Sequence, residues 1–204
     1  KERKDFSCAL LDSNGSLIAN APHIPVHLGA LGVCVRNVSR VLDLKAGDIA
    51  ITNHPGFGGS HLPDLTLIAP VFTEEDQLIG YVANRAHHAE LGGISPGSMP
   101  PNAKSLEEEG VVFEPAFLMR DGKVDWSSIE RTLTSCTYPT RRLRENLSDL
   151  AAQLASIRFG ESELRKMVGY YELDTICHYM ASLKKRAAGA LRSAFAGLTF
   201  EEQA

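Results

Sequence analysis

The first forty residues change from a strand-like pattern of apolar positions to a helix-like one. Apolar runs at residues 6–11 and 17–19 flank Asn14-Gly15, and an Asn-Gly pair between two such runs predicts a β-hairpin. Residues 20–27 contain two prolines, so we expect this segment to be extended. Apolar residues then recur at helical spacing, which predicts an amphipathic helix over residues 28–42.

Three further apolar runs predict strands on either side of a polar loop. Residues 49–52 and 78–83 have the length and composition of short strands, and residues 65–72 are almost continuously apolar, as in a strand buried on both faces. Residues 52–64 contain three glycines and two prolines, a composition that excludes a long helix or a central strand. The pattern therefore predicts a loop that buried strands hold in place.

From residue 127 onward the apolar positions follow helical spacing. Residues 127–130, Ser-Ser-Ile-Glu, resemble a capping box at the start of a helix. An apolar stripe then ends at Gly160, which we expect to be the glycine that terminates this helical stretch. A last stripe over residues 173–194 predicts another helix, ending near Gly197.

These patterns together predict an α+β fold. Residues 1–126 form a β-rich region that carries the candidate site, with one more short strand at residues 111–113, and residues 127–204 form a mostly helical region. A chain of 204 residues is long enough for one sizeable core. The charged residues 1–5 lead directly into a strand-like run and do not resemble a signal peptide.

The net charge and the apolar runs indicate which kinds of partner to expect, and the cysteine spacing indicates the role of the cysteines. The net charge of −4 gives no reason to expect nucleic acid or an anionic membrane as partner, and no apolar run reaches the ~18 residues of a membrane-spanning helix. The cysteines form no C-x-x-C motif, so we expect each to be a small buried residue of a cytoplasmic protein. They are Cys8, Cys34, Cys136 and Cys177.

The histidines carry the strongest chemical signal, because six of the seven fall between residues 23 and 88. His61 and Asp64 lie three residues apart in the polar loop, and imidazole with carboxylate is a ligand set for Mn, Fe or Zn. His54, and either His87 or His88, are candidates to complete such a site. Two other interpretations stay open: a metal-free acid–base site, and a hydrogen-bonded structural network.

Several sequence blocks resemble the hydantoinase B/oxoprolinase family, in the family's order and spacing. The resemblance covers essentially the whole chain. The blocks are residues 5–12, 23–29, 58–64, 84–88, 96–100, 108–110 and 141–153. One departure is Asn53-His54-Pro55, where many members of the family have Asn-Asp-Pro.

The resemblance implies a function and a partner. Members of the family are subunits or domains of N-methylhydantoinases and 5-oxoprolinases, and are related to acetone and acetophenone carboxylases. It implies that this chain is a B-type component of an ATP-dependent cyclic amidase, a hydrolase that acts on the C–N bond of a small cyclic amide. ATP would bind to a separate A-type ATPase subunit or domain, within a hetero-oligomer.

The alternatives are a subunit of a ketone carboxylase and a non-catalytic scaffold for an ATPase. Family B chains are more than twice as long, so we expect a fragment or a truncated member whose activity alone is in doubt.

The resemblance also assigns roles to individual residues. The carboxylase relatives carry manganese at the His-Leu-Pro-Asp segment, so a divalent metal is expected on His61, Asp64 and His88, joined by His54. The expected general base or substrate contact is His87 or His27. Arg85 is expected either to pair with a substrate carboxylate or phosphorylated intermediate, or to form a structural ion pair.

Overall fold

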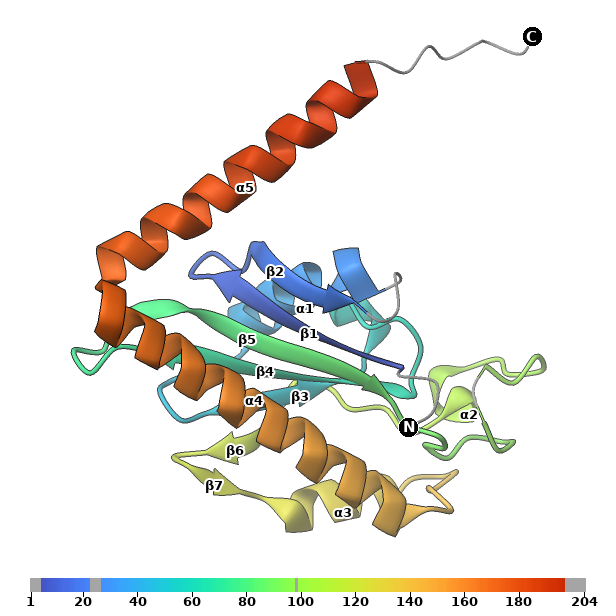
Figure 1. Ribbon diagram of the computed structural model, residues 1–204. Coiled ribbons are helices and arrows are strands. Elements are labelled where there is room, and N and C mark those ends of the chain that lie inside the picture. The colour runs from blue at the N-terminus through green and yellow to red at the C-terminus, as the bar shows by residue number, and fades with distance from the viewer. Residues whose placement is uncertain (1–4, 23–26, 98, 197–204) are drawn as a thin grey trace, which may run out of the picture.

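A computed structural model describes residues 5–22, 27–97 and 99–196, which fold around one antiparallel sheet of seven strands (Figure 1). The strand order is β2-β1-β5-β4-β3-β6-β7. The strands are β1 (Phe6–Asp12), β2 (Leu17–Pro22), β3 (Ile49–Thr52), β4 (Asp64–Phe72), β5 (Leu78–His87), β6 (Ala116–Arg120) and β7 (Lys123–Val124). The helices are α1 (His27–Val41), the 3-10 turn η1 (Pro55–Phe57), α2 (Leu106–Glu109), α3 (Trp126–Thr134), α4 (Leu143–Tyr171) and α5 (Leu173–Ala196).

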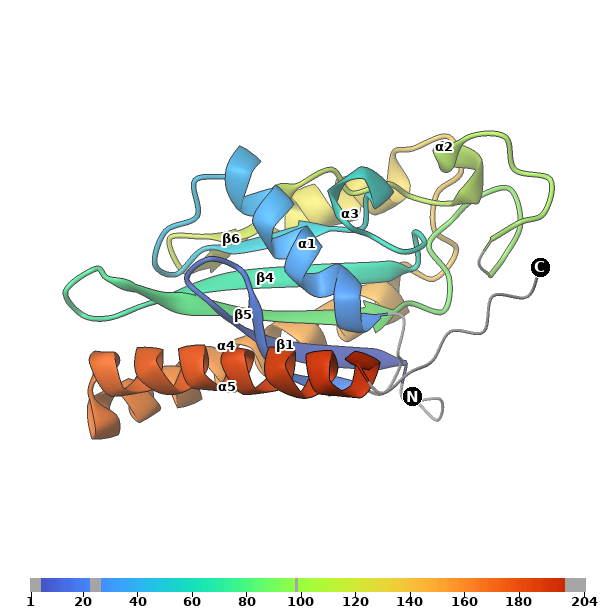
Figure 2. The same cartoon turned by 90° about the horizontal axis from the view of Figure 1, so that it is seen from above.

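The sheet separates two hydrophobic cores. Figure 2 shows α1 on one face, and α4 and α5 on the other. The central strand β4 is buried almost throughout, and its alternating side chains enter both cores. Leu65 and Leu67 join the α4 side, whereas Ile68 packs with the residues of α1. The α+β fold class is confirmed, and the continuous apolar run of β4 is explained by helices on both faces.

The strands and the helix expected around the polar loop are confirmed. The hairpin β1–β2 and the helix α1 form where the pattern predicts them, and β3 has the expected bounds. Strand β5 extends beyond the expected residue 83 to His87, because residues 84–86 pair with both β1 and β4 and His87 pairs with Asp64 of β4. Of the extended segment expected over residues 20–27, residues 23–26 lie outside the described part of the chain.

The expectation that Gly160 ends a helix is wrong. Helix α4 continues through Gly160 to Tyr171. A Cβ atom built at position 160 would lie 2.8 Å from Cγ1 of Val82, a residue of β5. Glycine is therefore needed here for close approach of helix and sheet, not for a helix end.

Two other local expectations need correction. The N-cap of α3 is Asp125, whose side chain accepts a hydrogen bond from the backbone N–H of Ser128, so Ser127 lies inside the helix and the capping box does not form. Residues 111–113 do not form a strand: Val111 and Phe113 bond to the side chain of Asn53, and the hydroxyl of Thr52 donates to the carbonyl oxygen of Phe113. The hairpin β6–β7 was not anticipated as a separate element.

The burial expected for the cysteines holds only for Cys34. Cys8 is partly buried, and Cys136 and Cys177 are exposed. Cys177 lies on α5, a long helix that runs out beyond the body of the protein (Figure 1), so most of its surface meets no other element. Within the described ranges, no helix combines the length and low charge needed to cross a membrane.

Candidate metal centre

The candidate site lies where β4 begins and β5 ends. Asp64 is the first residue of β4, and His87 is the last residue of β5. The two strands are antiparallel neighbours, and their register places these two residues opposite each other. The polar loop delivers Ser60 and His61 to the same end of the sheet just before Asp64, so the loop and the strand end converge on one carboxylate.

Hydrogen-bond donors surround the Asp64 carboxylate, which is only 1% exposed. Its Oδ1 lies 3.2 Å from Nδ1 of His87. Its Oδ2 lies 3.1 Å from Nδ1 of His61 and 3.2 Å from Nε2 of His27, and it accepts a bond from the hydroxyl of Ser60. Burial acts to raise the pKa of Asp64, but the bonds from His27, His61, His87 and Ser60 outweigh it and hold that pKa far below its usual range. The carboxylate is therefore ionised at neutral pH.

Two of these imidazoles are reachable from solvent. The side chains of His61 and His87 are 23% and 24% exposed, and their rings stack with centroids 4.9 Å apart. The hydrogen bond to Asp64 raises the pKa of His61, against the opposing effect of burial, and the negative charge of Asp5 adds to the rise. The arrangement attracts positive charge, whether a proton or a cation.

The donor set fits a divalent cation. Ligand atoms of His61, Asp64 and His87 all lie within 4.8 Å of one another, and so do those of Asp5, His27 and Asp64. Ligand atoms around one Zn ion lie about 3–4.5 Å apart, since each is about 2.0–2.2 Å from the metal. Two imidazoles with one or two carboxylates suit Mn, Fe or Zn better than Mg or Ca.

Two glycines of the loop allow its backbone to pack closely against neighbouring backbone atoms. Gly58 has a positive φ of 93°, and a Cβ there would lie 2.8 Å from the backbone nitrogen of Cys34 in α1. A Cβ at Gly59 would lie 2.3 Å from the carbonyl oxygen of Asn53. The loop is thus packed closely against α1 and against its own first residues, which restricts the position of His61.

The side chain of Arg85 bonds to the polar loop of residues 52–64. Its side chain is fully buried, its Nε donates to Oγ1 of Thr66 at 2.8 Å, and its Nη2 donates to the carbonyl oxygen of Gly58 at 2.7 Å. Both acceptors are neutral oxygens, so neither bond is an ion pair; Nη1 is buried with no hydrogen-bond partner among the described residues. We infer that Arg85 holds the loop in place.

His88 and His54 lie away from Asp64. His88 follows His87 and points to the opposite face of the sheet, since successive side chains alternate. Its ring nitrogens lie 3.0 Å from Oδ1 of Asn146 and 3.1 Å from Oε1 of Gln153, both on α4. His54 accepts a bond from the backbone of Gly56, and its Nε2 lies 3.5 Å from Oε1 of Glu114. The structure does not bring these two expected ligands to the cluster, and it brings His87 there instead.

Three participants were not anticipated: Asp5, Ser7 and Ser60. Asp5 directly precedes β1, Ser7 is the second residue of that strand, and Ser60 lies in the loop before β4; none carries a distinctive spacing motif. Asp5 begins one of the blocks that carry the family resemblance, which was the only signal for it in the sequence.

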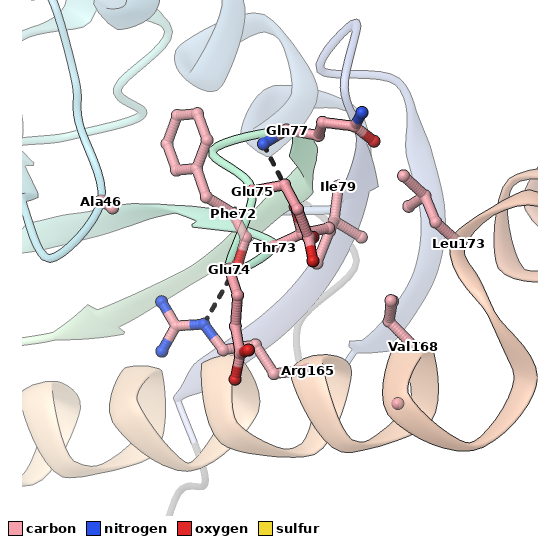
Figure 3. A pocket seen from close by; sticks show the side chains of 11 residues that line it. Ala46, Phe72, Thr73, Glu74, Glu75, Gln77, Ile79, Arg165, Val168 and Leu173 are labelled. Carbon is pink, nitrogen blue, oxygen red and sulfur yellow. Dashed lines mark hydrogen bonds between the residues drawn. The ribbon is translucent and has the colours of Figure 1, made fainter.

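Of two cavities in the structure, one borders the cluster around Asp64 and the other lies far from it. One, of about 420 Å³, is walled by the start of β1, the end of β5 and α4, and Asp5 and His87 contribute to its lining. Another, of about 720 Å³, lies at the opposite end of β4 and β5 (Figure 3). Figure 3 shows Arg165 reaching from α4 to the turn after β4, where its Nε donates to the carbonyl oxygen of Phe72 at 3.3 Å. The described lining of this second cavity contains no histidine or cysteine, so of these two cavities the smaller is the one that borders the cluster, at Asp5 and His87; its lining does not include Asp64 or His61.

Comparisons with known proteins agree with this architecture. Residues 1–202 match the family described as hydantoinase B/oxoprolinase. The chain is 44% identical over 204 residues to 5-oxoprolinase of Saccharomyces cerevisiae, covering 96% of this chain and 16% of the yeast protein. The chain thus spans a small part of the length of this relative.

Solved structures show the same fold. The crystal structure of ATP-dependent caprolactamase from Pseudomonas jessenii matches with a TM-score of 0.87 and 26% identity, over 97% of this chain and 34% of that chain. A nucleotide-free structure of acetone carboxylase matches with a TM-score of 0.74 over 86% of this chain and 23% of that chain, and its 20% identity supports the fold alone. The match along almost the whole sequence, joined to this likeness in fold, shows that the chain belongs to the hydantoinase B/oxoprolinase family.

Proposed function

We propose that this chain is the site-bearing part of a B-type component of an ATP-dependent cyclic amidase. It would complete the hydrolytic opening of a small cyclic amide, such as 5-oxoproline or a hydantoin. The observation that carries the proposal is the convergence of two solvent-accessible imidazoles on the buried, ionised carboxylate of Asp64. The identity to a 5-oxoprolinase and the likeness to a caprolactamase support the class of reaction.

In this proposal His61, Asp64 and His87 hold a divalent metal ion, Mn, Fe or Zn, with the carboxylate of Asp5 beside them. This set replaces the expected one, because His88 bonds to α4 and His54 bonds within its own loop. A metal bound there polarises an amide carbonyl or lowers the pKa of a bound water. The buried bonds to Asp64 keep the carboxylate oriented and ionised for this task.

The substrate would enter the cavity of about 420 Å³ beside His87. That volume lies in the range of small-molecule sites, and a five-membered lactam ring fits into it with room for water. Ala86 and Ala152 give part of the wall an apolar character, whereas the side-chain amide of Gln153 is already bonded to His88 and Asn84. In this proposal the amide of the ring faces His87, the one residue of the set His61, Asp64 and His87 that lines this cavity.

ATP would be used by a partner. The sequence has no glycine-rich loop followed by the lysine that a P-loop needs. We propose that an A-type ATPase subunit or domain activates the substrate carbonyl, and that this chain acts in a hetero-oligomer with it. The likeness to an enzyme described as ATP-dependent supports this division of labour.

The test combines metal analysis with an assay in the presence of the ATPase partner. We expect one equivalent of divalent metal per chain, and ATP hydrolysis that depends on 5-oxoproline or hydantoin. His61→Ala should remove both, whereas His178→Ala, at an exposed histidine of α5, should remove neither. If the protein binds no metal and His61→Ala retains full turnover, the catalytic role proposed for this chain is excluded. The chain would then be a non-catalytic scaffold for its partner. Bicarbonate-dependent ATP use with a ketone would instead identify a carboxylase.

A further inference from the structure

A chain of three buried polar side chains ends on Asp64. His27, the first residue of α1, is 1% exposed, and Ser7 of β1 is 0% exposed. Nδ1 of His27 lies 3.0 Å from the hydroxyl oxygen of Ser7, and Nε2 lies 3.2 Å from Oδ2 of Asp64. Both ring nitrogens are therefore occupied, away from solvent.

The direction of these hydrogen bonds follows from the partners. An ionised carboxylate only accepts, so Nε2 of His27 carries the proton and donates it to Asp64. In the tautomer that carries its proton on Nε2, Nδ1 is an acceptor, and the hydroxyl of Ser7 donates to it. Ser7 thus fixes both the tautomer and the ring plane of His27.

We propose that His27 is a positioning residue of the metal centre, held in place by Ser7; the inference rests on the proposed function. Its N–H occupies one lone pair of Oδ2 and fixes the plane of the Asp64 carboxylate. The other contacts of the carboxylate are with Ser60, His61 and His87, and the two imidazoles approach from the accessible side. A partner behind a metal-binding group commonly controls metal affinity in this way.

This role differs from the one expected from the sequence. A general base must reach the substrate proton directly or through one water. His27 is closed off by α1 and β1, and its donor is already committed to Asp64. The ligand atoms of Asp5, His27 and Asp64 also lie within 4.8 Å, so a direct ligand role for His27 is the competing assignment.

Two measurements on the 204-residue chain separate these roles. Zn²⁺ affinity is measured by competition with a chromophoric chelator, and ligand identity by the d–d absorption of the Co²⁺-substituted protein. We expect His27→Ala to weaken Zn²⁺ binding by about 10- to 100-fold while leaving the Co²⁺ band positions unchanged. His27→Gln keeps an N–H donor near the place of Nε2 and should recover part of the affinity. Ser7→Ala should cause a smaller loss, and His61→Ala should change the Co²⁺ bands.

Each contrary result has a distinct meaning. Unchanged Zn²⁺ affinity in both His27→Ala and Ser7→Ala overturns the positioning role. Co²⁺ bands that shift in His27→Ala as they do in His61→Ala overturn it in favour of a direct ligand. Failure of the wild-type chain to bind Zn²⁺ or Co²⁺ overturns the proposed metal centre itself. Circular dichroism checks that each variant is folded, and Ser7→Ala, which removes one oxygen, decides the question if His27→Ala does not fold.

Discussion

Asp64 is the residue on which the candidate site depends, because three imidazoles and one hydroxyl converge on its carboxylate. The four donors come from three parts of the chain: His27 from α1, His61 and Ser60 from the loop, and His87 from β5. A change at this one position therefore affects metal binding and local stability together.

Asp64→Asn should abolish metal binding and destabilise the metal-free protein. The amide removes the negative charge and turns one acceptor into a donor that faces other donors. We expect Zn²⁺ affinity to fall by more than about 100-fold, since a ligand loss exceeds the loss of a supporting bond. The free energy of unfolding at pH 7 should fall by about 2 kcal/mol, the typical value of a hydrogen bond to a charged group. Chemical denaturation with and without metal measures both effects, and Asp174→Asn, an exposed aspartate of α5, is the control.

As pH rises through the pKa of His61, we expect metal affinity to increase and the contribution of His61 to the stability of the metal-free protein to decrease. The folded pKa of His61 is raised above 6.5, so its contribution to stability is complete below pH 6.5 and is lost as pH rises through the raised pKa. The folded pKa of Asp64 is lowered, so its contribution is complete above pH 3.8 and is lost as pH falls below that value.

Metal competes with the proton on His61, so Zn²⁺ affinity should rise with pH above 6.5 until His61 is neutral. Isothermal titration at several pH values measures this, together with the protons released. An affinity independent of pH between 6 and 8 would mean that His61 is not a ligand.

At the scale of elements, the site results from the pairing of β5 with two strands that are distant in sequence. Pairing with β4 sets Asp64 opposite His87, and pairing with β1 brings Asp5 and Ser7 to the same end. Behind the sheet, α4 approaches β5 so closely that only glycine fits at position 160. Close packing of α4 also buries Asn146 and Gln153, the partners of His88.

Gly160→Ala should destabilise the protein although alanine favours helix. The helical gain is about 1 kcal/mol, but the new Cβ would lie 2.8 Å from Cγ1 of Val82, whose branched side chain has little freedom to move. Overpacking of this kind costs about 1–3 kcal/mol, so we expect a net loss of about 1 kcal/mol. Gly169→Ala is the matched control on α4, where nothing lies within 4 Å, and it should stabilise by up to about 1 kcal/mol. Thermal and urea unfolding compare the two; equal stabilisation by both would contradict the close contact.

At the scale of the whole molecule, α5 leaves a large apolar surface uncovered. Its exposed stripe consists of Tyr179, Leu183, Leu191 and Phe195, which are 49–64% exposed. Several large apolar side chains exposed along one helix are typical of a surface that binds another protein chain. The oligomeric assembly expected from the sequence stays a prediction, as does the division at residue 126; α4 packs on β4 and β5, so the helical region shares a core with the β-rich one.

The isolated chain should therefore self-associate through α5. Leu191→Lys should weaken the association and raise solubility, because it places a charge in the apolar stripe. Ser193→Lys adds the same charge to an exposed position on the other side of α5 and should have little effect. Sedimentation velocity over a range of concentrations measures both variants. A wild-type chain that stays monomeric at high concentration would refute the prediction.

The sequence by itself determined the kinds of element, the chemistry of the site and the family. Apolar periodicity predicts β3, β4 and α1 because burial on one or two faces leaves a local pattern. Clustered histidines around His61 and Asp64 indicate a site because few other functions concentrate imidazole in one loop.

Only the tertiary structure decided which histidine serves the site. His87 and His88 are adjacent in sequence, so they point to opposite faces of the sheet, and the sequence does not say which face holds Asp64. The roles of Asp5, Ser7 and His27 depend on β1 lying beside β5, a pairing between segments about 75 residues apart. The purpose of Gly160 likewise depends on a neighbour, Val82, that no local pattern reveals. Local patterns fix local structure, whereas contacts between distant segments arise only when the sheet and its helices are assembled.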